Sequence, residues 1–237
     1  MPAAGSGTRL DSDRPKAFVE LAGMTLLEHC VLGTLASGAA TEIVVAVPEA
    51  LVRPAQDLLA ALLASADLGP GAGTAVRVVA GGADRIASVD RALAAADSPD
   101  LVLVHDAARC LTPPAVFTRV VGALRAGAPA VVPVLPMTDT VKRATGTGPT
   151  GGEALVSDLD RAALRRVQTP QGFDAAVLRE AHAHQRSDPH PAATDDAQLV
   201  ERLGHPVEAV AGDERALKIT YPIDLRIARI HLEESPA

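Results

Sequence analysis

The chain has 237 residues, 48% of them hydrophobic, which is enough to bury the core of one large α/β domain. Its net charge of −7 and its aromatic content of only 2% argue against a nucleic-acid partner, which needs a broad basic surface or stacking side chains. The sequence shows no apolar run of membrane length and no signal peptide, and Cys30 and Cys110 fit neither a metal site nor a disulfide framework. We therefore expect a cytoplasmic protein without a membrane partner.

Short apolar runs alternate with helical patterns along the first part of the chain. The runs "TEIVVAVP", "VRVVAGG", "LVLV" and "APAVVPVLP" are predicted strands, and helices are predicted over about 51–64, 88–96 and 113–127. This alternation predicts an α/β fold with a mainly parallel twisted sheet and helices on both faces, in one domain over residues 1–237. Ligands of such sheets bind at the carboxyl ends of the strands.

The alternation breaks after Pro136. A Gly/Thr/Pro cluster flanked by polar, strand-like pieces predicts a protruding β-hairpin arm over about 137–163, with its tip near 146–152. The globular pattern resumes at Gln168. It predicts a helix over about 175–182, a helix beginning at "TDDAQLVERLG", a strand at "HPVEAVAG" and a closing helix at "YPIDLRIARIHL".

The first candidate for chemistry is the loop "PAAGSGTR", which begins directly after Met1. Its small residues and glycines allow backbone N–H groups to surround a phosphate, and Arg9 and Lys16 supply positive charge nearby. The loop is neither a P-loop, nor a G-x-G-x-x-G turn, nor a serine nucleophile elbow. An ordinary glycine turn remains the alternative.

Two further motifs follow predicted strands. In "GGADRIASV" the glycines let a base or ribose approach the backbone, and Ser88 can bind a base edge or simply cap a helix. In "VHDAAR" the carboxylate of Asp106 stands at the end of an apolar strand, where it can hold Mg²⁺ and ligand phosphates. Arg109 would face the same cleft, unless it only pairs with Asp106.

The remaining polar motifs lie in the second half. Thr140, Arg161 and Thr169 can bind a second phosphate, that of an acceptor. For Thr194, capping a helix N-terminus can be the whole role. "GDERALKIT" brings Lys218 close to acidic residues. The histidines of "AHAHQRSDPH" are two residues apart and face different sides of a helix, so we interpret that segment as solvated rather than metal-binding.

Taken in order, "PAAGSGTR", "PKAF", "GGADRIASV", "VHDAAR", "PVLPMTDTVK", "TPQGF", "TDDAQLVE" and "KITYPIDL" resemble the 2-C-methyl-D-erythritol 4-phosphate cytidylyltransferase family almost from end to end. The resemblance implies a Rossmann-like nucleotidyltransferase fold and a homodimer held by the hairpin arms. It also implies the reaction of CTP with a polyol phosphate, methylerythritol phosphate, to give the CDP-alcohol of non-mevalonate isoprenoid synthesis and pyrophosphate, with Mg²⁺.

The resemblance also implies roles for individual residues. Those implied for the CTP triphosphate are Ala3, Ala4, Gly5, Arg9 and Lys16, and those for the rest of CTP are Gly81, Gly82, Ser88 and Ala107. Those implied for the acceptor are Asp106, Arg109, Thr140, Arg161, Thr169 and Thr194. Metal ligands are Asp106 and a second carboxylate, Asp213 or Glu214, while Arg9, Lys16 and Lys218 are the catalytic cations. Thr140 and Arg161 are expected to reach the partner subunit's site.

The chain departs from the family pattern at two places. Cys110 replaces the usual proline after "HDAAR", and we expect its thiol to pack rather than react. The hydrophobic strand that precedes the glycine loop in the family is missing from this sequence. We expect either that the native protein begins upstream of Met1 or that the shortened enzyme has lost much of its activity. The alternatives are a ribitol-5-phosphate cytidylyltransferase, a non-catalytic CTP-binding module and, last, a dinucleotide oxidoreductase, which the glycine spacing disfavours.

Overall fold

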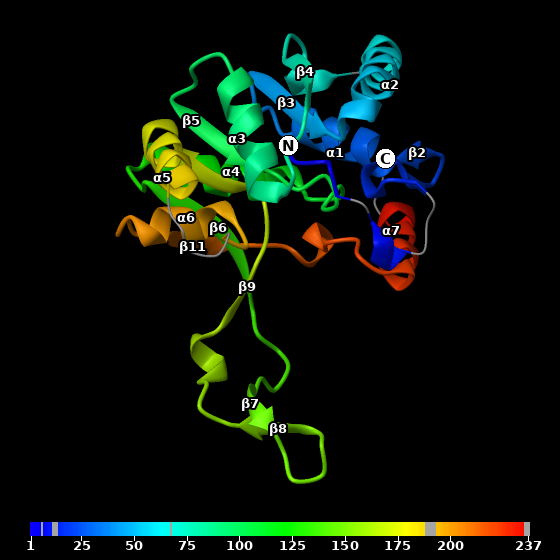
Figure 1. The fold of residues 1–237 in the computed structure, drawn as a ribbon. Helices are drawn as coiled ribbons and strands as arrows, with labels where there is room; N and C mark the ends of the chain where they lie inside the picture. Colours follow the sequence, from blue (N-terminus) through cyan, green and yellow to red (C-terminus); the bar gives the residue numbers. More distant parts are fainter. Residues whose placement is uncertain (6, 11–13, 67, 188–192, 235–237) are drawn as a thin grey trace.

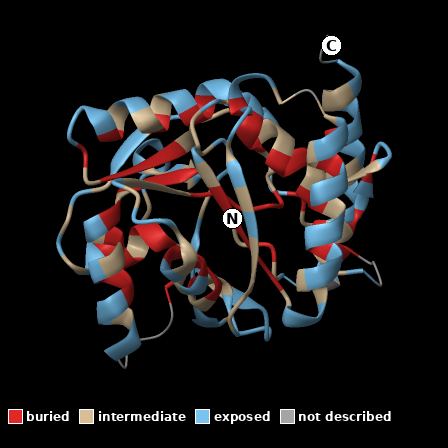
Figure 2. Ribbon diagram, turned by 90° about the horizontal axis from the view of Figure 1, so that it is seen from above, coloured by how far each residue is buried: buried red, intermediate tan, exposed pale blue. Residues whose placement is uncertain are grey.

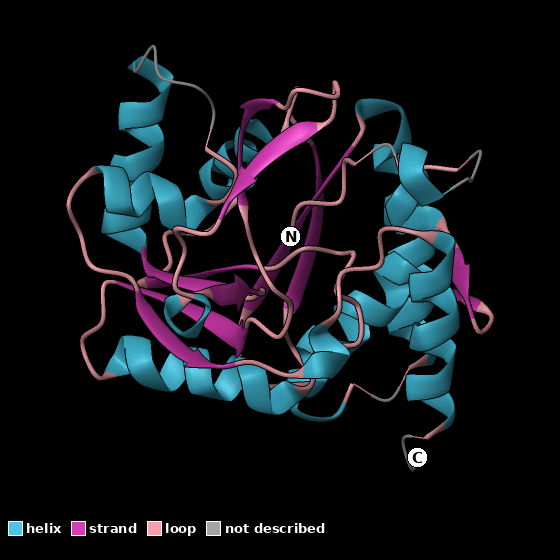
Figure 3. Ribbon diagram, turned by 90° about the horizontal axis from the view of Figure 1, so that it is seen from below, coloured by secondary structure: helices cyan, strands magenta, loops and turns pink. Residues whose placement is uncertain are grey.

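The computed structural model describes residues 1–5, 7–10, 14–66, 68–187 and 193–234. The strands form a central layer with helices on either side (Figures 1 and 3). The α-helices are α1 Leu26–Ala36, α2 Val52–Ser65, α3 Arg85–Ala95, α4 Pro114–Arg125, α5 Ala175–Ser187, α6 Asp196–Arg202 and α7 Pro222–Glu233. The strands are β1 Glu20–Leu21, β2 Met24–Thr25, β3 Glu42–Val47, β4 Ala75–Ala80, β5 Leu101–Val104, β6 Ala130–Pro136, β7 Arg143–Thr147, β8 Glu153–Val156, β9 Arg165–Val167, β10 Gln171–Asp174 and β11 Glu208–Ala211. Short 3₁₀ turns are η1 Thr8–Leu10, η2 Lys16–Phe18, η3 Glu49–Leu51, η4 Gly69–Gly71, η5 Arg161–Ala163 and η6 Glu214–Ala216.

The sheet is mixed, so the prediction of a mainly parallel sheet is wrong. β3 and β4 pair in parallel, and so do β6 and β11. β10, however, lies antiparallel between β5 and β6, and β9 pairs antiparallel with the far end of β6. The reason is the route of the chain: after β6 it runs out through the hairpin and returns in the opposite direction, without a helical crossover.

The layer is interrupted between β3 and β5. Among the described residues, β3 pairs only with β4 and with a single bridge at Pro2, and β5 pairs only with β10. Ala3 donates from its backbone N–H to Ala46, and Ala107 donates to Pro2, so Met1–Ala3 link the two parts. A cavity of about 400 Å³ lies beside this link, between β3 and β5. Among the described residues, Met1–Ala3 thus join β3 to the segment after β5 through backbone hydrogen bonds, without forming a full strand.

Helices cover both faces of the layer, as predicted. Successive residues of a strand point to opposite faces, so each strand packs against helices on both sides. Val131 of β6 packs with Val120 and Leu124 of α4. Its neighbours Ala130 and Val132 pack on the opposite face, against the helices α3, α5 and α6. Figure 2 shows the buried residues along the strands and on the inner sides of the helices.

β7 and β8 pair antiparallel and protrude from the body (Figure 1). Gly146 and Gly151 have φ angles of 136° and 85°, values that L side chains rarely adopt, which explains the glycines at this tip. Leu155 of β8 is 55% exposed. Within the described residues, no helix combines the length and apolarity required to cross a membrane.

Phe173 joins β10 to its neighbours in the core. It is 0% exposed and pairs with Val102 on one side and Ala130 on the other. We expect Phe173→Ala to lower the free energy of unfolding by about 3–5 kcal/mol, because the cavity is added to the lost transfer free energy. Urea unfolding would measure this. Ile223→Ala, at a 53% exposed position, is the control and should change it by less than about 0.5 kcal/mol.

Candidate functional site

A pocket of about 460 Å³ opens at the carboxyl ends of β4 and β5. It is formed by the glycine loop, the start of α3, the segment after β5 and the segment after η6. Ten residues predicted from the sequence line it: Ala3, Ala4, Gly5, Arg9, Lys16, Gly82, Ser88, Asp106, Ala107 and Lys218. The structure therefore brings together residues from five separate motifs.

The glycine loop places Lys16 against its own start. The backbone N–H of Lys16 donates to the carbonyl of Gly5 at 3.3 Å. Gly7 has a φ of 72°, and a Cβ at this position would lie 2.9 Å from the Cβ of Lys16. A side chain at residue 7 would therefore push the lysine away. The guanidinium of Arg9 lies 5.7 Å from the centre of the Tyr221 ring.

The motif around Ser88 forms the opposite wall. Asp84, rather than Ser88, is the N-cap of α3, since its side chain accepts from the N–H of Ala87. The hydroxyl of Ser88 is buried and accepts from the N–H of Gly82 at 3.0 Å. A Cβ on Gly82 would lie 2.4 Å from that of Ala87, so only glycine brings the backbone this close to α3. Gly81 lies just behind this wall, where its N–H donates to a β3 carbonyl.

Asp106 is the one carboxylate held by two cations in this pocket, among the described residues. Its Oδ1 lies 3.1 Å from the Nε of Arg85, and its Oδ2 lies 2.8 Å from the Nζ of Lys218. Burial alone would raise the pKa of this carboxyl, but Arg85 and Lys218 hold it well below its usual range. The carboxyl of Asp106 is therefore ionised at neutral pH.

Thr169 fixes the backbone beneath this carboxylate. Its hydroxyl oxygen accepts from the N–H of Asp106 at 3.0 Å and lies 2.9 Å from the Nδ1 of His105. Burial lowers the pKa of His105 to about 3, so the ring beside the threonine hydroxyl is neutral. Thr169 is only 4% exposed. Thr169 therefore holds the backbone of Asp106 by a hydrogen bond and does not line the pocket.

Four other predicted acceptor residues lie outside the pocket lining. Arg109 donates to the carbonyls of Val167 and Ala216, with its Nε buried and unpartnered. Thr140 and Arg161 are exposed near the base of the hairpin arm. Thr194 is also exposed, and the N-cap predicted for it is Asp195, which accepts from the N–H of Gln198.

Neither candidate for the second metal carboxylate, Asp213 or Glu214, contacts Asp106; each has another partner. The side chain of Asp213 caps η6, and Glu214 pairs with Arg166 at 2.8 Å. In the part of the chain that the structure describes, no three His, Cys, Asp or Glu side chains gather as a metal site. Cys110 is 4% exposed, and burial raises the pKa of its thiol to about 12, in agreement with the packing role predicted for it.

Sequence analysis missed three residues of this region. Arg85 lines the pocket and contacts Asp106, and behind it Asp196 and His182 are buried. The interpretation of the His182 segment as solvated is therefore wrong for His182, although His184 is exposed. One available signal was the position of Arg85 at the first residue of α3, because a cation is unfavourable at a helix N-terminus unless a carboxylate compensates it.

A family comparison decides between the alternatives. The sequence model of the IspD family, described as 2-C-methyl-D-erythritol 4-phosphate cytidylyltransferase, matches residues 1–234. The chain belongs to this family. It is a nucleotidyltransferase, and its activity is the transfer of a cytidylyl group from CTP to 2-C-methyl-D-erythritol 4-phosphate in isoprenoid biosynthesis.

Individual relatives agree with the family match. The chain is 50% identical to the enzyme of that name from Rhodococcus jostii over 234 residues, covering 99% of this chain and 94% of the relative. It is 50% identical to that of Nocardia farcinica, with 100% and 94% covered. Among solved structures, the cytidylyltransferase of Thermus thermophilus superposes with a TM-score of 0.72 at 40% identity, over 98% of this chain and 97% of that one. The 4-diphosphocytidyl-2C-methyl-D-erythritol synthase of Anaerococcus prevotii gives a TM-score of 0.78 at 26% identity, with 98% and 96% covered.

The electrostatics of Lys16 predict a pH effect. Burial, reinforced by the charges of Lys218 and Arg9, lowers the pKa of its ammonium to about 8. If the protonated form binds the triphosphate, kcat/KM for CTP falls as the pH rises through about 8, because this lysine loses its proton before an ordinary one. A pH profile of kcat/KM would show the fall, and Lys16→Arg should move it to higher pH. A flat alkaline limb in the natural protein would contradict the assignment.

Proposed function

We propose that the pocket around Asp106 is where the cytidylyl group is transferred. The observation that carries this proposal is the gathering of Arg9, Lys16, Arg85 and Lys218 beside a glycine-rich backbone, in a chain whose net charge is −7. Such a cluster offsets the charge of a triphosphate locally, and the surrounding negative charge restricts where an anion binds.

The glycine loop is the proposed triphosphate site. The backbone of Ala3, Ala4 and Gly5 and the side chains of Arg9 and Lys16 would bind the phosphates. The wall formed by Gly82 and Ser88, with Gly81 behind it, would hold the cytosine by close backbone approach. Ala107, at the far edge of the pocket, would contact the ribose.

Asp106 is the proposed magnesium ligand. Mg²⁺ uses one or two carboxylates together with substrate phosphates, so a single ionised carboxylate at a triphosphate pocket fits it. Asp213 remains our proposal for a second carboxylate, with Glu214 as the alternative. When bound, Mg²⁺ would neutralise developing charge on the phosphates. Lys218 would then have to exchange its contact with Asp106 for one with substrate.

The transfer itself requires no covalent intermediate with the enzyme. A phosphate oxygen of methylerythritol phosphate attacks the α-phosphorus of CTP, and the bond to the bridging oxygen breaks to release pyrophosphate. Both reactants are anions, so the task of the protein is to align them and to offset their charge. Lys16 and Lys218 line the same pocket as Asp106 and would do this.

The acceptor phosphate is proposed to be bound by Arg109, Thr140, Arg161, Thr169 and Thr194, together with Asp106. Thr140 and Arg161 belong to the exposed arm, outside the pocket lining of their own subunit. We therefore propose a homodimer in which each arm supplies these two residues to the partner subunit's pocket. A cytoplasmic location is part of the proposal, since CTP is an intracellular nucleotide.

Pyrophosphate release with CTP and Mg²⁺ tests the proposed acceptor and the proposed site. We expect turnover with methylerythritol phosphate and not with ribitol 5-phosphate. Lys218→Met should lower kcat by about 10²- to 10³-fold, the range for losing one preorganised charge contact. The matched control is Arg53→Met, which removes a cation from the exposed surface of α2.

Other outcomes of that assay have defined meanings. A preference for ribitol 5-phosphate would show that the protein is a ribitol-5-phosphate cytidylyltransferase instead. CTP binding without turnover on either acceptor would make it a binding module. Full activity of Lys218→Met would place the chemistry elsewhere.

The arm has its own test. Leu155→Asp puts a charge on an exposed apolar position of β8 and should shift the sedimenting species from dimer to monomer. Ile230→Asp makes the same change on α7, where Ile230 is 51% exposed, and should leave the dimer intact. The reverse pattern would assign the interface to α7 instead of the arm.

A further inference from the structure

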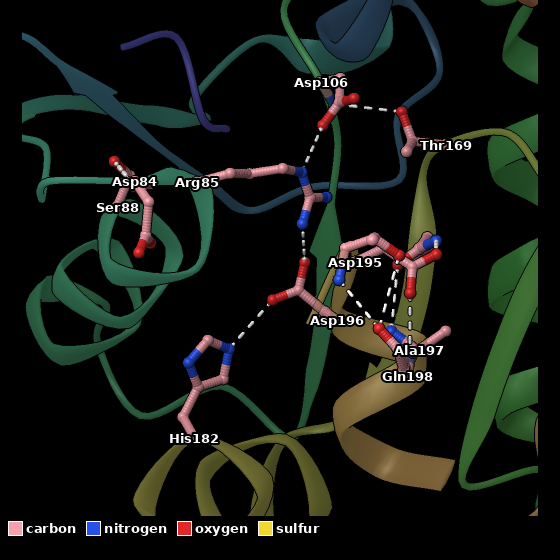
Figure 4. Close-up of polar contacts among 12 residues, drawn as sticks. Asp84, Arg85, Ser88, Asp106, Thr169, His182, Asp195, Asp196, Ala197 and Gln198 are labelled. Carbon is pink, nitrogen blue, oxygen red and sulfur yellow. Dashed lines mark hydrogen bonds and ion pairs between the residues drawn. The ribbon is translucent and has the colours of Figure 1, made fainter. Parts of the chain in front are cut away.

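A chain of buried polar contacts runs from the pocket into the protein interior (Figure 4). The guanidinium of Arg85 contacts Asp106 through Nε, and through Nη1 it contacts Oδ2 of Asp196 at 2.6 Å. The other oxygen of Asp196 lies 3.0 Å from Nε2 of His182. A carboxylate only accepts hydrogen bonds, so Nε2 carries the proton and donates it.

Neither Asp196 nor His182 lines the pocket. Asp196 is 0% exposed and His182 only 2% exposed, and they come from α6 and α5, whereas Arg85 comes from α3. The chain of contacts therefore ties three helices to the pocket carboxylate. On its outer side, the other ring nitrogen of His182 lies 3.8 Å from Asp90, which pairs with Arg186 at the surface.

Stability alone does not account for this arrangement. Replacing a buried ion pair by well-packed apolar side chains is often neutral or stabilising, because burying the two charges is costly. Here a fully buried carboxylate is retained, with both oxygens satisfied by polar partners. One of those partners leads directly to the pocket.

The two cations on Asp106 differ in how firmly they are held. The side chain of Lys218 is 43% exposed and ends in a rotatable ammonium. That of Arg85 is 23% exposed, and its planar guanidinium is fixed by Asp196 at a second point. Arg85 is thus the contact that determines which way the carboxylate of Asp106 faces, while Lys218 is able to leave it for substrate.

We propose that Asp196 and His182 are positioning residues, which hold Arg85 so that it orients the Asp106 carboxylate for the reaction. The inference rests on the proposed function of Asp106. It assigns Arg85 a fixed place between two carboxylates instead of a role in binding phosphate.

Kinetics of Asp196→Asn and of two His182 variants test the proposal. The asparagine keeps the shape of Asp196 but removes its charge, so Arg85 loses its anchor. We expect kcat per folded molecule to fall about 10- to 100-fold, as for residues that orient a ligand from behind, with KM for CTP changed less than about threefold. His182→Leu, which removes the donor to Asp196, should lower kcat in the same direction. His182→Gln, which keeps an N–H near the Nε2 position, should restore most of it.

Arg186→Gln is the matched control, because it breaks the surface pair with Asp90 and leaves Asp196 untouched. It should retain the natural kcat. Crystal structures of the natural protein and of Asp196→Asn add a direct readout, in which the Asp106 carboxylate should be turned away from its position against Arg85.

The proposal is overturned if kcat falls only in proportion to the unfolded fraction, or if His182→Gln is as impaired as His182→Leu. It is also overturned if Asp106 keeps its orientation in Asp196→Asn. Asp106→Asn, assayed alongside, separates the two levels of inference. If Asp106→Asn is fully active, the proposed function of Asp106 fails. If it is inactive while Asp196→Asn and His182→Leu are unaffected, only the positioning role fails.

Discussion

The structure depends on one charge that is placed where charges are costly. Asp106 stands at the end of β5, largely buried, and remains ionised only because Arg85 and Lys218 approach it from two sides. Arg85 is brought there by α3, and Lys218 by the segment that follows η6. These elements have to pack correctly before the carboxylate is compensated, so the integrity of the pocket and the packing of the fold are linked through this group.

The fold could be predicted from the sequence wherever one segment carries its own pattern. "EIVVAV" forms β3 and the Pro-initiated run forms α4, because apolar spacing and terminal residues suffice to define such elements. The direction of β10 could not be predicted in this way. "QGFD" has four residues and no periodicity of its own, and its antiparallel place between β5 and β6 is decided by where the arm returns the chain.

Only part of the pocket could likewise be predicted from the sequence. Gly82 and Asp106 follow strands in recognisable motifs, and the structure gathers them with the glycine loop and Lys218. The partners of Arg85 were not predictable, because Asp196 lies 111 residues further along the chain and its neighbouring acid, Asp195, has the ordinary task of capping α6. His182 gave no signal either: a histidine on a polar helix is usually solvated, and only the packing of α5 against α3 and α6 buries it.

Among the described residues, the two walls of the pocket belong to separate hydrogen-bonded ladders. The glycine loop and the start of α3 adjoin the β3–β4 side, whereas Asp106 and Ala107 continue from β5. A nucleotide that touches both walls adds its binding free energy to the link between them, because a ligand that binds only the folded state stabilises it. The folded chain is therefore more stable with a nucleotide bound across both walls of the pocket than without one.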